Sequence, residues 1–118
     1  MADRGTVVWA PDPFKTDDGN PRPWLVVSGE RITYPDEESI AVAFTTQPHH
    51  PGSFAVPSEV WIRREPGQQS YVLPWTVASP KDDLRIVGRQ VSVTNEFTEQ
   101  VTSATISYFD NSEASDST

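Results

Sequence analysis

The sequence lacks cysteine altogether, and none of its apolar runs approaches the roughly 18 residues that a membrane-spanning helix requires. Without cysteine, the chain can form neither disulfides nor thiolate metal sites. It also lacks the nucleotide motifs Gly-x-Gly-x-x-Gly and Gly-x-x-x-x-Gly-Lys-Ser/Thr and the zinc motif His-Glu-x-x-His. No cationic and then apolar leader precedes Val7. We therefore expect a cytoplasmic protein that has no cofactor and no membrane partner.

Lysine is nearly missing: the chain has two lysines and seven arginines against 17 acidic residues, which gives a formal net charge of −8. This lysine-poor, acidic composition resembles that of proteins from salt-loving archaea. At low salt an acidic surface would disfavour nucleic acid, because phosphate contacts need basic residues that displace counterions. In molar salt the Debye length falls to about 3 Å, so long-range repulsion is screened. Net charge therefore does not exclude RNA as a partner.

Length and composition predict one folded domain. At 118 residues the chain is long enough to bury about two-thirds of its unfolded surface around a single core. Residues 110–118 contain three acids, three serines and no base, which is typical of a disordered segment. We therefore expect a single domain at residues 1–109 and a disordered acidic tail at 110–118.

Most of the folded part is predicted to be β-structure. Short runs rich in β-branched and aromatic residues alternate with prolines, glycines and polar turns. Pro74 interrupts one run and predicts a bulge or an edge position, because proline cannot donate to a sheet ladder. The pattern indicates a small, strongly bent antiparallel sheet or barrel. The predicted strands are residues 6–9, 24–27, 40–46, 58–63, 70–78 and 84–88, with brief pairing at 54–56.

A change of period after residue 92 predicts one C-terminal helix. Thr94 or Asn95 can cap it, and Glu96 lies in its first turn. Apolar residues then recur every three to four positions, as in a helix that packs one face on a sheet. Four threonines and two serines lower the helix propensity, so packing on the sheet must supply the stability. The stripe consists of Phe97, Val101, Ala104 or Thr105, and Tyr108.

Arg22 is the first candidate functional residue. A proline on each side restricts the backbone, so the guanidinium extends from a rigid segment of the chain. Its partner is either a carboxylate such as Glu30 or a phosphate of a ligand. Thr45 and Thr46 end the next strand, either as β-branched filler or as hydroxyl donors. If the two strands pair antiparallel, Arg22 and Thr45 lie at one rim of the sheet and make a phosphate site.

The two histidines, His49 and His50, are adjacent in a proline-flanked loop. Neighbouring side chains diverge in an extended segment, so we expect no shared metal site. Two interpretations stay open: general acid/base groups, or solvated loop residues.

Aromatic side chains are candidates for stacking on unpaired bases, which is how single-stranded RNA is commonly held. Most tryptophans in a domain of this size belong to the core, so only one or two would face a ligand. The candidates are Trp24, Trp61, Tyr71 and Trp75.

Four segments, in this order, resemble the MazF/PemK/Kid family of toxin ribonucleases. Residues 5–9 (Gly-Thr-Val-Val-Trp) are similar to the family's opening strand, and residues 22–28 (Arg-Pro-Trp-Leu-Val-Val-Ser) to its Arg-Pro-x-Leu-Val motif. Residues 40–46 resemble its third strand, which ends in threonine. Ser70 begins a segment similar to the family's Ser-x-Val-x-x-x-Gln-apolar-Arg. The resemblance covers about residues 5–108.

The resemblance implies an SH3-like barrel of curved antiparallel strands with a C-terminal helix, a homodimer, and a cognate antitoxin as protein partner. It also implies metal-independent cleavage of single-stranded RNA, in which the ribose 2′-hydroxyl attacks the neighbouring phosphate. Such a reaction needs a cation on the phosphorane and proton transfer at the attacking and leaving oxygens. Arg22 matches the family's active-site arginine, and Thr45 matches its active-site threonine.

The segment that starts at Ser70 departs from the family pattern. Trp75, Thr76 and Ala78 stand where family members carry an acid, a glutamine and an arginine. The two histidines or Lys15 are candidate substitutes, and Lys15, Trp75 and Thr76 are candidates for RNA binding. Two hypotheses follow: a toxin endoribonuclease, or a non-catalytic barrel that binds RNA or an antitoxin-like peptide.

Overall fold

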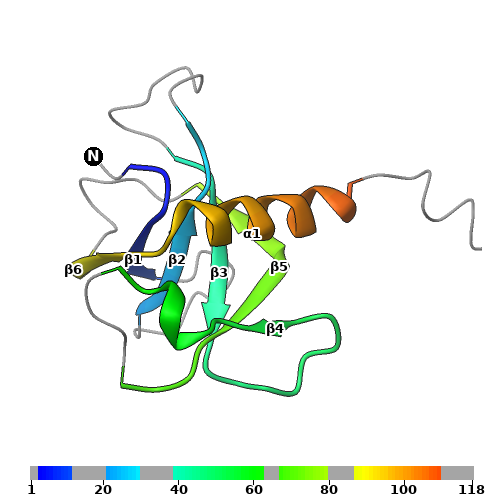
Figure 1. Ribbon diagram of the computed structural model, residues 1–118, viewed down its shortest axis with the longest axis horizontal. Helices are drawn as coiled ribbons and strands as arrows, with labels where there is room; N and C mark the ends of the chain where they lie inside the picture. Colours follow the sequence, from blue (N-terminus) through cyan, green and yellow to red (C-terminus); the bar gives the residue numbers. More distant parts are fainter. Residues whose placement is uncertain (1–2, 12–20, 30–38, 63–66, 80–86, 110–118) are drawn as a thin grey trace, which may run out of the picture.

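β-Strands dominate the structure and form one antiparallel sheet that curls beneath a helix (Figure 1). The computed structural model describes residues 3–11, 21–29, 39–62, 67–79 and 87–109. Within these ranges six strands pair in the order β4-β5-β3-β2-β1-β6. The elements are β1 (Thr6–Pro11), β2 (Pro21–Val26), β3 (Ala41–Thr45), β4 (Phe54–Ala55), the 3₁₀ turn η1 (Ser58–Val60), β5 (Tyr71–Ala78), β6 (Val87–Ser92) and α1 (Asn95–Ser107).

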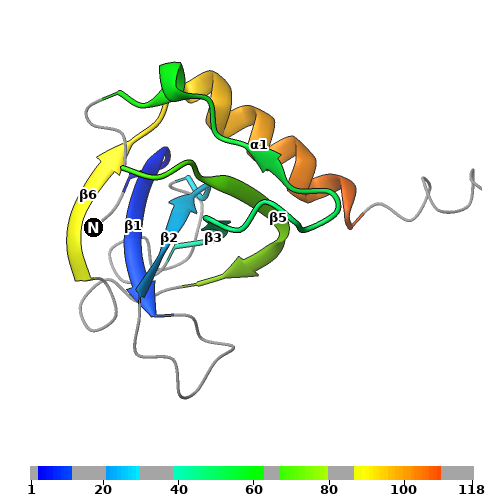
Figure 2. The ribbon, with the colours of Figure 1, turned by 90° about the horizontal axis from the view of Figure 1, so that it is seen from below.

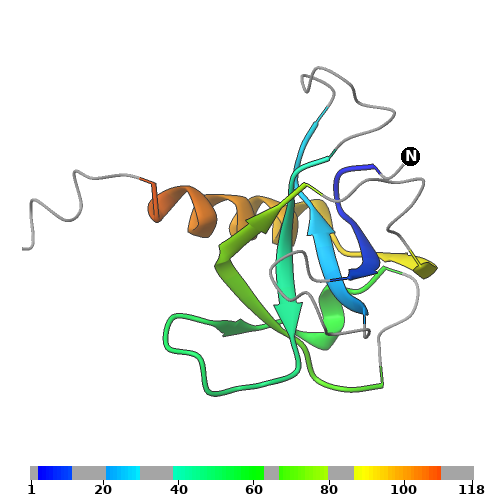
Figure 3. The ribbon, with the colours of Figure 1, turned by 180° about the vertical axis from the view of Figure 1, so that it is seen from behind.

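The sheet carries an apolar cluster on each face. The larger cluster lies between the sheet and α1, which contributes Phe97 and Val101 (Figure 2). The smaller cluster lies on the opposite face, because its residues alternate with those of the larger cluster along the strands. Figure 3 shows the sheet from the side away from α1. The strands contribute Val7, Leu25, Val42, Phe44, Val72 and Val91 to the larger cluster, and Val8, Ala10, Trp24, Val26, Ala41, Ala43 and Leu73 to the smaller one.

β3 is buried at all five of its positions. Alternate residues of the strand enter the two clusters, with Val42 and Phe44 on the α1 side and Ala41 and Ala43 on the other. A strand that is buried on both faces is a continuous apolar run rather than an alternating one. Burial on both faces of the sheet therefore explains the continuous apolar run from which a strand was predicted at residues 40–46.

The bulge predicted at Pro74 is confirmed. β3 pairs with β5 so that Val42 faces Val77 while the next residue, Ala43, faces Leu73. The residues between Leu73 and Val77 therefore have no counterpart on β3. Extra residues of this kind bend a strand and increase its twist. The bulge thus contributes to the curl of the sheet seen in Figure 2.

The predicted C-terminal helix is also confirmed. Thr94 is its N-cap, and its hydroxyl oxygen accepts a hydrogen bond of 3.2 Å from the backbone N–H of Phe97. Phe97, Val101 and Thr105 are buried, as the apolar stripe predicts. The last member of the predicted stripe is wrong, because Tyr108 is the C-cap and is 54% exposed. Its ring lies at the surface, in edge contact with Trp75 of β5, rather than in the core.

The strand predicted at 58–63 is wrong. Ser58–Val60 form a 3₁₀ turn, and Trp61 makes only a single bridge, to Val93. Pro57, whose backbone is extended, accepts a hydrogen bond of 3.2 Å from the N–H of Val60, so the chain turns where the pattern predicted extension. The segment then crosses the end of β6, where α1 begins, and no long ladder can form there.

Other boundaries differ by a few residues. β1 continues to Pro11, and β2 begins at Pro21. Each of these two strands therefore has a proline at one end. The last strand lies at Val87–Ser92 rather than 84–88, and the earlier part of that prediction lies outside the described residues. Lys15, Glu30 and the tail at 110–118 also lie outside them. No helix in the described ranges is long and apolar enough to cross a membrane.

Gly5 joins three parts of the chain at the start of β1. Its N–H donates to the carbonyl of Val26 at 2.8 Å, and its carbonyl accepts from the N–H of Val93 at 2.9 Å. Its φ of +93° lies in the left-handed region, which favours glycine, and an added Cβ would lie 3.4 Å from the hydroxyl of Thr98. This backbone role gives a physical reason for a glycine before the first strand.

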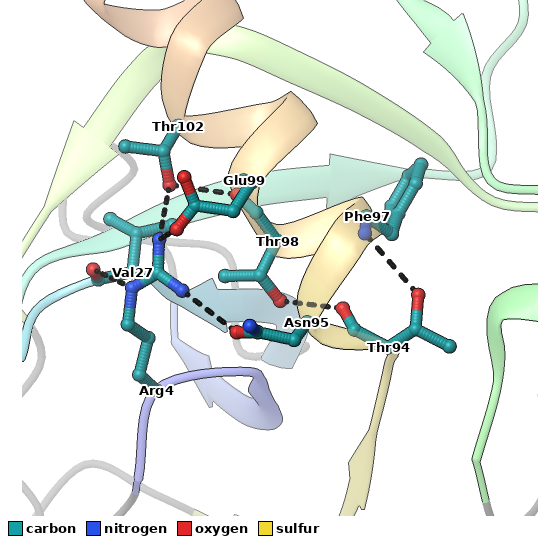
Figure 4. A network of polar contacts seen from close by, with 8 residues as sticks. All are labelled: Arg4, Val27, Thr94, Asn95, Phe97, Thr98, Glu99 and Thr102. Atoms are coloured by element: carbon teal, nitrogen blue, oxygen red, sulfur yellow. Dashed lines mark hydrogen bonds and ion pairs between the residues drawn. The ribbon is translucent and has the colours of Figure 1, made fainter.

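Arg4 fastens the start of the chain to β2 and α1 (Figure 4). Its Nε donates to the carbonyl of Val27 at 3.1 Å, and its Nη1 donates to Asn95 Oδ1 at 3.2 Å. Its Nη2 contacts Glu99 Oε1 at 2.7 Å and Thr102 Oγ1 at 3.4 Å. One guanidinium therefore crosslinks three elements that are far apart in sequence.

We predict that Arg4→Ala lowers the free energy of unfolding by about 1.5–3 kcal/mol, because charge-assisted bonds and a backbone carbonyl lose their donor together. Glu99→Gln should cost less than about 1 kcal/mol, because the Glu99 side chain is 63% exposed and its ion pair is screened by solvent. Urea unfolding followed by circular dichroism measures both values. Equal losses in the two variants would mean that the ion pair, rather than the crosslink, carries the effect.

Candidate functional site

Arg22 and Thr45 meet at one rim of the sheet. β2 and β3 pair antiparallel, with Trp24 opposite Ala43 and Leu25 opposite Val42. Continued by two residues, this register places Arg22 opposite Thr45. The antiparallel pairing on which the predicted phosphate site depends is therefore present.

A cavity of about 370 Å³ opens at this rim. Its volume is at the lower end of the range of about 300–1,000 Å³ that is usual for small-molecule sites. β1, β2, β3 and the segment that leads into β5 all contribute to it. The described lining consists of Trp9, Arg22, Pro23, Phe44, Thr45, Thr46, Gly67, Gln68 and Ser70.

The cation and the hydroxyl lie on the same face of the sheet. Side chains two residues apart in a strand point to the same face. Arg22 is two residues from Trp24, and Thr45 is two residues from Ala43, and both of these neighbours belong to the smaller cluster. Trp9 belongs with the larger cluster on the opposite face. The cavity therefore lies at the edge where residues from both faces of the sheet meet, and both Arg22 and Thr45 line it.

The hydroxyl of Thr45 is oriented by the backbone. Thr45 is only 7% exposed, and its Oγ1 accepts a hydrogen bond of 3.1 Å from the N–H of Gln47. A threonine hydroxyl both accepts and donates, so this bond engages the oxygen and leaves the O–H proton to serve as a donor. A donor fixed in this way can bind an anion in the cavity with little further loss of side-chain freedom.

The polar groups of the cavity suit a phosphate. The described lining has one guanidinium, the hydroxyls of Thr45, Thr46 and Ser70, and the carboxamide of Gln68. These groups donate hydrogen bonds, and a guanidinium matches the geometry of phosphate oxygens. The described lining contains no carboxylate and no histidine. The arrangement can bind and polarise a phosphodiester, but these side chains offer no group that titrates near neutrality.

His49 and His50 do not join this cavity. Both side chains are exposed in the turn that follows β3, and neither lines the site. The backbone carbonyl of His50 accepts from the N–H of Ser53 at 3.0 Å and from its hydroxyl at 2.7 Å. In this structure the segment forms a turn, and the two imidazoles face solvent.

Trp75 and Thr76 also lie away from the cavity, in the bulged part of β5. Trp75 is 39% exposed and makes an edge contact with Tyr108, with ring centroids 5.7 Å apart and an interplanar angle of 62°. Gly52 of the loop after β3 lies against both rings, since an added Cβ would be 3.2 Å from Trp75. The geometry therefore places Trp75 beside the end of α1 rather than beside Arg22.

Base stacking on Trp24 is excluded. Its side chain is fully buried in the smaller cluster, and its indole N–H donates to the carbonyl of Ala10 at 3.3 Å. Trp61 is half-buried and packs edge-on against Phe44. The tryptophan that does line the cavity is Trp9, which was not among the predicted candidates.

Trp9, Gln68 and Ser70 line the cavity but were not identified as candidates from the sequence. Trp9 lies opposite Pro23 in the β1–β2 ladder, so its position follows once these strands are paired around the proline-flanked arginine. Ser70 starts one of the segments that resemble the toxin family, which was a usable signal. Gln68 follows a glycine in a turn and carries no pattern that would have identified it.

No protein-family model matches the sequence, and no curated protein matches it. Solved structures do match. An endoribonuclease in complex with its cognate antitoxin, from a mycobacterial species, aligns with a TM-score of 0.58 and 19% identity, over 91% of this chain and 93% of that chain. An endoribonuclease from a mycobacterial species aligns with a TM-score of 0.63 and 21% identity, over 90% of this chain and 88% of that chain.

At these identities the likeness establishes the fold. The described chain is mainly β, with six antiparallel strands in a curled half-barrel and one C-terminal helix, and the two endoribonucleases share this architecture. The predicted fold class is therefore confirmed.

Proposed function

We propose that this protein is the toxin of a type II toxin–antitoxin system, a metal-independent endoribonuclease that cleaves single-stranded RNA. The observation that carries the proposal is that Arg22 and Thr45 line one cavity at one rim of the sheet. The fold supports it, because structures of similar fold are endoribonucleases, one of them bound to its cognate antitoxin. The MazF/PemK/Kid-like sequence segments include both residues and support the same assignment.

In the proposed reaction the ribose 2′-oxygen attacks the adjacent phosphorus, and the bond from phosphorus to the 5′-oxygen breaks. The 2′-hydroxyl loses its proton, and the leaving 5′-oxygen gains one. The products are a 2′,3′-cyclic phosphate and a free 5′-hydroxyl. Arg22 stabilises the charge that develops on the phosphorane, and the Thr45 hydroxyl donates to a non-bridging oxygen. Trp9 and Gln68 contact the nucleotide beside the scissile phosphate.

The proposed partners are single-stranded RNA, a cognate antitoxin and a second copy of the chain. The acidic composition, with a net charge of −8, supports a protein that works in the cytoplasm of a salt-loving cell. Molar KCl screens repulsion between this surface and RNA. Cleavage assays therefore belong in molar KCl, with EDTA to remove divalent metal.

We predict that Arg22→Ala reduces the rate of RNA cleavage by about 10²–10³-fold, as expected when a donor to developing oxyanion charge is removed. Thr45→Val removes one hydroxyl at nearly constant volume and should reduce the rate by at least about tenfold. Thr76→Val is the matched control and should retain nearly full activity, because Thr76 lies outside the cavity. Single-turnover cleavage of a labelled RNA measures all three rates. A rate unchanged by Arg22→Ala would refute the site.

The pH dependence tests proton transfer. The described lining contains no group that titrates near neutrality, so hydroxide from solvent removes the 2′-proton in the proposed reaction. We therefore expect the rate to rise about tenfold per pH unit from pH 5 to 8, with no plateau. A His49→Gln, His50→Gln double variant should retain this profile. A plateau above about pH 7 that disappears in the double variant would show that a histidine is the base.

One observation favours a second function, a non-catalytic barrel that binds RNA or an antitoxin-like peptide. The described cavity has anion donors but no acid/base pair, and Trp75 and Ala78 replace the charged residues of the family pattern. In this case RNA would bind and quench tryptophan fluorescence, yet stay intact. Detection of the cyclic phosphate product separates the two functions.

A further inference from the structure

We infer that Gln68 makes the cavity selective for adenine at a nucleotide beside the scissile phosphate, and that Gln69 positions Gln68 for this role. The inference rests on the proposed function, because it concerns the RNA that this site cleaves. In the proposed reaction Arg22 and Thr45 act on the phosphate, which is the same in every RNA. Selectivity among RNA sequences must therefore come from other groups that line the cavity.

The carboxamide of Gln68 is available to a ligand. Gln68 lies in the segment that leads into β5, so it reaches the cavity from a different part of the chain than β2 and β3 do. Gln68 is exposed, and no residue in the described ranges makes a hydrogen bond to its carboxamide. A carboxamide carries a donor and an acceptor at a fixed spacing, whereas a hydroxyl rotates. Gln68 therefore presents a pattern that can distinguish one base edge from another.

Gln69 holds the segment that carries Gln68. Its Nε2 donates to the carbonyl of Val56 at 2.8 Å and to the carbonyl of Ser70 at 2.9 Å. The N–H of Val56 also donates to the carbonyl of Ser70, at 2.8 Å, directly after the β4–β5 ladder. Val56 and Ser70 are both buried. The Gln69 side chain thus ties the segment to a buried part of the fold, so Gln68 loses less freedom when a base binds.

Trp9 provides the stacking surface for the base. It lines the cavity, lies opposite Pro23 in the β1–β2 ladder and packs against the larger cluster. These contacts fix the position of the ring beside the cavity. An aromatic ring can stack on any base, since every base has a π-face. Trp9 therefore contributes affinity without selectivity, and the choice of base depends on Gln68.

The chemistry of the described lining favours adenine. Arginine or lysine pairs with guanine, a carboxylate pairs with cytosine, and glutamine or asparagine pairs with N6 and N7 of adenine. Arg22 is engaged by the phosphate in the proposed reaction, and the described lining contains no carboxylate. The amide nitrogen of Gln68 donates to N7, and its oxygen accepts from the N6 amino group. These base edges are accessible in a single strand whose bases are unstacked.

Sequencing of cleavage sites tests the inference. A randomised single-stranded RNA is incubated with the full chain in molar KCl, and the product ends give the bases on both sides of every cut. Adenine should be enriched on one side by at least about fivefold, the lower limit expected from one bidentate pair. Gln68→Ala should abolish this enrichment. Gln100→Ala is the matched control and should retain it, because Gln100 is exposed on α1 and does not line the cavity.

Gln68→Glu tests selectivity by exchanging the donor for an acceptor. A carboxylate only accepts hydrogen bonds, so it matches the N4 amino group of cytosine and is opposed by N7 of adenine. The enrichment should therefore move from adenine to cytosine. An enrichment of adenine that persists in Gln68→Glu or in Gln68→Ala would overturn the inference, as would an unmodified protein that shows no preference for adenine.

Gln69→Met tests the positioning role, because it removes the amide donor at a similar side-chain length. The KM for an adenine-containing RNA should rise about three- to tenfold, while kcat and the KM for a matched cytosine RNA stay within about twofold. A role confined to stability would lower the melting temperature without changing the ratio of the two KM values. That result would overturn the positioning role of Gln69.

Binding of uncleavable oligonucleotides separates this inference from the proposed function. Oligo(dA) and oligo(dC) lack the attacking 2′-hydroxyl, and quenching of tryptophan fluorescence measures their binding. The unmodified protein should bind oligo(dA) at least about fivefold more tightly than oligo(dC), and Gln68→Ala should bind both equally. If no RNA is cleaved, the proposed function is refuted, and this difference in binding alone decides the inference. Equal binding by the unmodified protein would overturn it.

Discussion

The antiparallel pairing of β2 with β3 is the constraint on which the rest of the structure depends. It places Trp24 opposite Ala43, and the same register continued by two residues brings Arg22 and Thr45 to one rim, where both line the cavity. A slip of one residue would turn every buried side chain of these strands to the wrong face, so the two apolar clusters fix the register. The packing of the core on both faces of the sheet therefore determines the geometry of the site. It fixes the positions of the Arg22 guanidinium and the Thr45 hydroxyl at one rim.

The same strand pair separates two surfaces of different chemistry. One end carries a polar cavity suited to a phosphate, and the other carries an apolar groove under the end of α1. The bulge around Pro74 bends β5 between them, and the Trp75–Tyr108 contact ties that bend to the end of the helix. Two surfaces of different chemistry therefore lie at opposite ends of one strand pair.

Sequence reasoning succeeded where a signal is local or strictly ordered. The start of the helix at Thr94, the strand β3 and the bulge at Pro74 each follow from the properties of a few neighbouring residues. The rim position of Arg22 and Thr45 followed from strand order alone. The prediction of a strand at 58–63 failed because a turn after Pro57 and the start of α1 govern that segment. The places of Trp9 and Gln68 in the cavity depend on tertiary packing that no local pattern encodes.

The central claim is that Arg22 and Thr45 act on one phosphate. A double-mutant cycle in RNA cleavage tests it most directly, using Arg22→Ala, Thr45→Val and the combined variant. If both residues stabilise the same transition state, the combined loss is smaller than the product of the single losses, by about fivefold or more. Independent, multiplicative losses would contradict the shared site, as would cleavage that survives both substitutions.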